Sequence, residues 1–224
     1  MKNNESMKSL VIVGSGALAS EVVSYIKDIN SVQKQFEICG FLDDNGLNAF
    51  EKNKTKYQLD CEYLGTTKDF EFSDSYFYVI CFSNVVARKD LIIQLKLPIS
   101  CYPNIVHPSV QFGNGYSLGH GNIIGPNCVI GPACNIGDFN ILTSYSYISH
   151  DCNVGDNNFL STAGLAGNVI LGNNNFLGIR VTVIPSITIG NDNLFQAGMV
   201  VDSNIKNSEA VFYKYKERFF VNRE

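Results

Sequence analysis

His150 and Asp151 form the pair of adjacent side chains in this sequence that is best suited to proton transfer. An imidazole exchanges its proton near neutral pH, and a neighbouring carboxylate can orient the ring and favour its charged form. Of the two other histidines, His107 precedes Pro108 and is interpreted as structural, and His120 is interpreted as an ordinary surface residue. His150 is therefore the candidate general base, with Asp151 as its partner.

A glycine-rich segment near the N-terminus is the candidate phosphate-binding turn. Residues 14–19, GSGALA, follow an apolar run and precede a stretch with helical spacing. Such glycines let the backbone approach a phosphate at a helix N-terminus. We expect Gly14, Ser15, Gly16 and Ala17 to bind a pyrophosphate. NAD and a nucleotide-linked sugar both carry one, but the second half of the chain offers no dehydrogenase substrate domain, which disfavours NAD.

Four further polar residues follow the predicted strands of this region. Asp43 and Asp44 end the second strand, and Asn84 and Arg88 come after the third. Carboxylates there can accept hydrogen bonds from a base or a ribose. We predict all four as ligand-binding residues, with loop and helix-start roles as the alternative for Asn84 and Arg88.

Residues 1–102 alternate between strand-like and helix-like stretches, which predicts a small Rossmann-like α/β domain with a parallel sheet. Residues 103–205 instead repeat an aliphatic or aromatic residue every six positions, and such hexapeptide repeats build an all-β parallel β-helix. The tail, 206–224, is predicted to cap its open end. The inward residues are Val106, Phe112, Leu118, Ile124, Ile130, Ile136, Leu142, Ile148, Val154, Leu160 and Ala166, then, after a step shortened by one, Leu171, Leu177, Val183, Ile189, Phe195 and Val201.

A second set of positions, four after each aliphatic residue, should also face inward. Cysteines stand at some of them, and Cys134 and Cys152 are expected to be vertical neighbours that stay reduced. Asparagines stand at others, and stacked amides can hydrogen-bond along the axis. These asparagines are Asn122, Asn140, Asn158, Asn175 and Asn193.

The step shortened by one falls between Ala166 and Leu171 in this register, with Asn168 one coil from His150. An irregular turn can expose backbone N–H groups, which stabilise the oxyanion formed when a carbonyl is attacked. The pattern of glycines also breaks nearby, at Thr143 and Ser149. We therefore expect the reaction site beside this turn.

Composition argues against several classes of function. The net charge of -4 provides no basic excess for nucleic acid. No apolar run approaches the roughly 20 residues that span a bilayer, and the first residues lack a signal-peptide core, so we expect a cytoplasmic protein. Seven cysteines without a Cys-x-x-Cys pair predict neither a disulfide framework nor a metal site.

The combination of GSGALASEVV, GFLDD and ISHDCNVGDNNFLSTAGLAGNVILGNNNFLG resembles the sugar acyltransferases of the sialic acid O-acetyltransferase type. It is most similar to nucleotide-aminosugar N-acetyltransferases of the bacillosamine, viosamine and perosamine type. The resemblance implies a left-handed β-helix, a homotrimer with active sites between subunits, and an N-terminal domain that holds the nucleotide sugar, preferably UDP- or dTDP-linked. It also implies acetyl-CoA as co-substrate, with His150 as base for direct attack of the sugar amine.

Acetyl-CoA is then expected beside the coils that carry Gly167, Asn168, Gly178, Ile179, Ala197 and Gly198. Three departures from the family pattern bear on the ligands. Leu18 and Phe159 stand where relatives carry histidines, and AVFYKYKERFF replaces the usual Gly-Val-Pro-Ala ending. A sugar O-acetyltransferase and a non-catalytic β-helix binding protein are the alternative interpretations.

Overall fold

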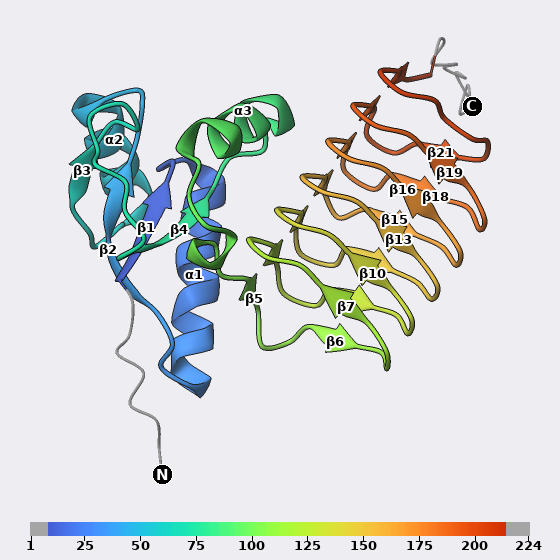
Figure 1. Ribbon diagram of the computed structural model, residues 1–224, viewed down its shortest axis with the longest axis horizontal. Helices are drawn as coiled ribbons and strands as arrows, with labels where there is room; N and C mark the ends of the chain where they lie inside the picture. The colour runs from blue at the N-terminus through green and yellow to red at the C-terminus, as the bar shows by residue number, and fades with distance from the viewer. Residues whose placement is uncertain (1–8, 214–224) are drawn as a thin grey trace, which may run out of the picture.

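The computed structural model describes residues 9–213 and has two parts, an N-terminal α/β domain and a β-helix (Figure 1). A parallel sheet of order β3-β2-β1-β4 forms the centre of the first part, and buried apolar runs such as Leu10–Val13 explain why these segments become strands. The elements are β1 (Ser9–Val13), α1 (Ala17–Val32), β2 (Glu37–Leu42), α2 (Leu47–Tyr57), β3 (Tyr63–Gly65), β4 (Phe77–Ile80), α3 (Val85–Leu95) and a 3₁₀ turn, η1 (Ile99–Cys101).

Short parallel strands then wind into a triangular coil with three faces, as predicted. The first face holds β5 (Ile105–Val106), β8 (Ile123–Ile124), β11 (Ile141–Leu142), β14 (Phe159–Leu160), β17 (Phe176–Leu177), β20 (Leu194–Phe195) and β22 (Ala210–Val211). The second holds β6 (Gln111–Phe112), β9 (Val129–Ile130), β12 (Tyr147–Ile148), β15 (Gly164–Leu165), β18 (Thr182–Val183) and β21 (Val200–Val201). The third holds β7 (Ser117–Leu118), β10 (Asn135–Ile136), β13 (Asn153–Val154), β16 (Ile170–Leu171) and β19 (Thr188–Ile189).

The interior of the coil follows the six-residue repeat. Ile124, Ile130 and Leu142 are fully buried, because each packs on its equivalents in the neighbouring coils. The asparagine ladder is confirmed as well. Asn140 donates its backbone N–H to the side-chain oxygen of Asn122, and Asn158 does the same to Asn140, at 2.8 and 2.9 Å. Buried amides are thus satisfied along the axis.

The predicted inward cysteines are buried. Cys134 and Cys152 are 0% exposed, and burial raises the pKa of both thiols, that of Cys152 to about 11. They are therefore neutral core groups at physiological pH, which leaves no thiolate there to act as a nucleophile.

The shortened step lies one turn earlier than predicted. Tyr147 pairs with Gly164 and Ile148 with Leu165, so Leu165 is the inward residue. Leu165 is fully buried, whereas Ala166 is partly exposed. The larger side chain fills the interior better, and the prediction that Ala166 keeps the register was therefore wrong. The shortened turn consists of residues 161–163, whereas the equivalent turn of the preceding coil has one residue more, 143–146.

The coils continue beyond the predicted boundary at residue 205. Strand β22 pairs with β20, and Asn193 accepts the backbone N–H of Glu209 at 2.7 Å, so the ladder reaches this last strand. The rest of the predicted capping tail, 214–224, lies outside the described residues. No helix within 9–213 is both long and apolar enough to cross a bilayer.

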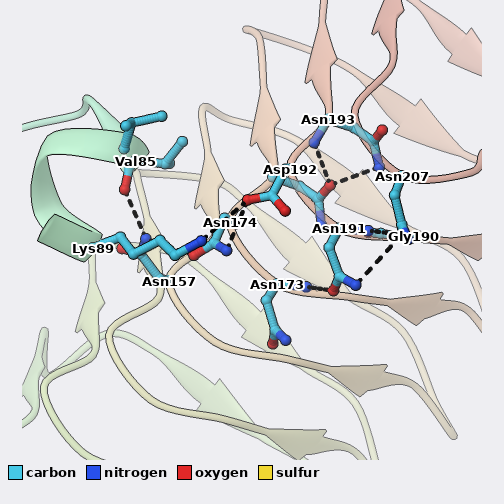
Figure 2. Close-up of polar contacts among 12 residues, drawn as sticks. Val85, Lys89, Asn157, Asn173, Asn174, Gly190, Asn191, Asp192, Asn193 and Asn207 are labelled. Carbon is cyan, nitrogen blue, oxygen red and sulfur yellow. Dashed lines mark hydrogen bonds and ion pairs between the residues drawn. The ribbon is translucent and has the colours of Figure 1, made fainter. Parts of the chain in front are cut away.

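The two parts are joined along the first face and the corner before it. Helix α1 packs against β5, and His107 binds Asp28 of α1 through Nε2 at 3.0 Å, which agrees with its predicted structural role. At the corner between the third and first faces, Asn157 donates to the Val85 carbonyl of α3 at 2.8 Å (Figure 2). Lys89 of α3 lies 3.7 Å from Asp192.

Arg88 makes the most deeply buried of these connections. Its guanidinium donates to the side-chain oxygen of Asn157 at 2.9 Å and to the carbonyls of Phe139 and Asn158 at 3.3 Å. The side chain is 1% exposed, and no carboxylate of the described residues pairs with it. Burial lowers the pKa of Arg88 to about 9, which still leaves it charged at neutral pH.

Candidate active site

A cavity of about 710 Å³, here named the first pocket, opens at the carboxyl ends of β1, β2 and β4. This is where open parallel sheets generally bind ligands. Most of the predicted ligand-binding residues line it together, but Arg88 does not. The predicted residues that line it are Gly14, Ser15, Gly16, Ala17, Asp43, Asp44 and Asn84.

The acidic and amide side chains of the first pocket are already bonded within the protein. Asp43 accepts hydrogen bonds from the backbone and hydroxyl of Ser15, which fixes the glycine turn. Asp44 accepts from the backbone N–H of Thr67 at 2.7 Å, and Asn84 caps α3. The first turn of α1 differs, because Gly16 at its N-cap has no side chain to accept from the free N–H groups. The backbone N–H groups of this first turn are therefore available to bind an anion.

A second pocket of about 400 Å³ adjoins the first and shares Ala17, Leu18 and Ser83 with it. Its other side is the corner between the first and second faces of the β-helix. Leu18 and Phe159, two of the three departures noted in the sequence, both line it. Of the remaining lining residues, the sequence pattern singled out only Thr143, as a break in the glycine pattern. These remaining residues are Glu21, Thr143, Ser144, Ser161 and Thr162.

His150 lies at the next corner, between the second and third faces. Its Nδ1 is 2.7 Å from the Asp151 carboxylate, and both side chains are about half exposed, at 54% and 55%. A carboxylate only accepts, so Nδ1 carries the proton and Nε2 of the neutral ring has a free lone pair. The pair therefore presents a base toward solvent.

Gly167 of the next coil lies directly beneath this imidazole. A Cβ at Gly167 would stand 2.5 Å from both Cε1 and Nε2 of His150, so a larger residue there would push the ring out of this position. The Asn168 N–H donates to the His150 carbonyl at 3.0 Å and is not free for an oxyanion. The Gly167 N–H has no acceptor among the described residues. Of the two candidate donors to the oxyanion, only the Gly167 N–H therefore remains available.

Gly167→Ala is expected to lower turnover by at least about tenfold, because the new methyl group must displace the imidazole from its orientation. Steady-state kinetics with thermal unfolding checks this. The matched control is Ile170→Ala, an exposed residue of the same coil, which should leave turnover within about twofold. Unchanged turnover in Gly167→Ala would show that the ring position is unimportant.

The remaining predicted cofactor residues lie apart from His150. Gly178, Ile179 and Ala197 line an apolar third pocket of about 580 Å³ at the corner between the first and second faces, and Gly198 follows directly. The pocket also contains Leu194 and Phe212. Within one chain the candidate base and this pocket therefore occupy different corners. No group of three His, Cys, Asp or Glu side chains in the described part of the chain is placed to hold a metal ion.

Comparison with known proteins finds structural similarity only. No family model and no curated protein matches the sequence. The acetyltransferase domain of PglB from Neisseria gonorrhoeae FA1090, also solved with acetyl coenzyme A, is 19% identical with a TM-score of 0.76 and coverage of 91% of this chain and 95% of that one. PerB from Caulobacter crescentus, in complex with CoA and GDP-perosamine, is 23% identical with a TM-score of 0.74 and coverage of 90% and 92%.

WeeI from Acinetobacter baumannii AYE is more distant, at 16% identity and a TM-score of 0.54, with coverage of 90% of this chain and 94% of that one. These similarities extend over both parts of the chain. They confirm the predicted fold class, a Rossmann-like α/β domain followed by a left-handed parallel β-helix.

Proposed function

We propose that the protein is an acetyl-CoA-dependent N-acetyltransferase that acts on the amine of a nucleotide-linked 4-amino sugar, in the synthesis of surface-glycan precursors such as lipopolysaccharide O-antigen. The observation that carries the proposal is the His150–Asp151 pair lying on Gly167, on the same fold as two neighbours solved with acetyl coenzyme A and with CoA plus GDP-perosamine.

The first pocket would hold the nucleotide diphosphate. The open first turn of α1 presents its N–H groups there, and a helix N-terminus favours negative charge. The sugar would then extend into the second pocket, since the two pockets share residues. UDP and dTDP are our preferred nucleotides, while GDP is the one bound to PerB.

The third pocket would hold part of acetyl-CoA. Its apolar wall, with Ile179 53% and Phe212 62% exposed, offers surface that the pantetheine arm or adenine can cover. Because Gly-Val-Pro-Ala is absent, Phe212 is a candidate contact for the adenine end.

The chemistry needs no acyl-enzyme. The amine nitrogen attacks the thioester carbon, and His150 Nε2 takes a proton from it. The Gly167 N–H donates to the oxyanion, the C–S bond breaks, and the CoA thiolate leaves and receives the proton. The products are an amide and free CoA.

A single chain does not bring the reacting groups together, because His150 and the second pocket lie at different corners of the coil. We therefore propose a homotrimer in which His150 of one subunit faces the pockets of its neighbour. We place the trimer in the cytoplasm, where its buried thiols stay reduced.

The test is a thiol-release assay with acetyl-CoA and a panel of UDP-, dTDP- and GDP-linked 4-amino sugars. Rapid CoA release with one member is expected. Turnover on hydroxyl sugars alone would instead indicate an O-acetyltransferase, and the absence of both turnover and acetyl-CoA binding would indicate a β-helix binding protein.

A further inference from the structure

Among the residues that the structure describes, Glu21 is the only charged side chain that lines the second pocket. It lies on α1 in an exposed position, and no lysine, arginine or histidine within the described residues forms an ion pair with it. A carboxylate at the edge of a cavity without a cationic partner is an acceptor available to a ligand.

Tyr25, one helical turn further on, holds this carboxylate in place. Its hydroxyl donates to Glu21 Oε2 at 3.1 Å, and its ring packs edge-on against His107 at the junction of the two domains. Burial raises the pKa of Tyr25 to about 12, so the phenol stays protonated and remains a donor at neutral pH. The position of Glu21 is thus coupled to a rigid part of the molecule.

The opposite wall carries four hydroxyl groups, on Thr143, Ser144, Ser161 and Thr162. It is built by the shortened turn, 161–163, and by the equivalent turn of the preceding coil, 143–146. Thr143 replaces the usual glycine, and its Oγ1 accepts the backbone N–H of Thr162 at 2.8 Å. Leu18 and Phe159 provide the apolar surface. Hydroxyls and apolar groups facing a single carboxylate suit a deoxy sugar that bears one amine.

We propose that Glu21 binds the amino group of the acceptor sugar in the second pocket and so determines the preference for an amine over a hydroxyl. This inference rests on the proposed function. An ammonium or amine donates a strong N–H bond to the carboxylate, whereas a hydroxyl offers a single neutral donor. A primary amine attacks with its own lone pair and carries two N–H bonds, so one N–H can donate to Glu21 while His150 takes the other proton.

The experiment compares dissociation constants, measured by calorimetry on the full-length protein, for matched ligands. GDP-perosamine is paired with the GDP-6-deoxyhexose that bears a hydroxyl at the same carbon, and equivalent UDP- and dTDP-linked pairs are measured alongside. Wild type is expected to bind one amine at least tenfold more tightly than its hydroxyl partner. The Glu21→Gln variant can still accept the hydrogen bond from Tyr25. It is expected to raise the dissociation constant of the amine-bearing ligand about tenfold and that of the hydroxyl-bearing ligand less than twofold.

Glu51→Gln, an exposed glutamate of α2 outside the pocket, is the matched control and should retain the preference. An amine preference that is equal in wild type and Glu21→Gln would overturn the inference, and so would a wild type without any preference. Thiol release by the wild type separates the two ideas. Turnover on the amine with an unchanged preference in Glu21→Gln rejects only the role of Glu21, whereas no turnover rejects the proposed function.

Discussion

His150→Ala is expected to lower kcat by at least about a hundredfold, because the variant has no group to take the proton of the attacking amine. The fold should be unaffected, since the side chain is half exposed and, within residues 9–213, hydrogen-bonds only to its neighbour Asp151. Acetyl-CoA affinity should change little, so the loss should appear in kcat. Single-turnover kinetics measures the rate of the chemical step, and thermal unfolding measures whether the fold is intact.

His120→Ala is the matched control. His120 is also an exposed histidine, 3.8 Å from Asp138, but it lies at the corner between the third and first faces. Turnover in this variant should stay within about twofold of wild type. A fully active His150→Ala, or an equal loss in both variants, would contradict the assignment of the base.

Arg88→Ala is expected to destabilise the protein by about 3 kcal/mol or more, because it leaves a cavity and several buried acceptors without a donor. The acceptors belong to the β-helix, so the variant should also loosen the docking of α3. Urea unfolding gives the change in stability, and amide exchange at the junction gives the change in docking.

Lys89→Ala tests the neighbouring position of the same helix. Its partner Asp192 and Lys89 itself are about half exposed, so this ion pair should contribute less than about 1 kcal/mol (Figure 2). Equal stability of the two variants would show that Arg88 does not hold the domains together.

The repeat architecture was predictable because each coil position has a simple physical requirement. An aliphatic residue such as Ile130 must fill the interior, and an amide such as Asn140 must hydrogen-bond along the axis. The glycine turn was predictable for a similar reason, since it requires a strand before it and a helix after it. The pairing of His150 with Asp151 was visible because the two residues are adjacent.

Features that depend on contacts between the two parts of the chain were not predictable from spacing. Arg88 was interpreted as a ligand-binding residue, but its side chain turns into the junction to reach the carbonyls of Phe139 and Asn158. Glu21 had no distinguishing pattern, because a glutamate on an exposed helix face is ordinary. The shortened turn was misplaced because Leu165 and Ala166 both fit the aliphatic pattern, and only the pairing with Ile148 decides between them.

The most direct measurement is mass spectrometry of the nucleotide sugar after incubation with acetyl-CoA and the wild-type protein, before and after treatment with hydroxylamine. We expect one acetyl group on the 4-amino sugar that survives hydroxylamine, as an amide does, and none when His150→Ala replaces the wild type. A product that hydroxylamine cleaves, or no acetylated product from any nucleotide amino sugar, would contradict the proposed N-acetyltransferase.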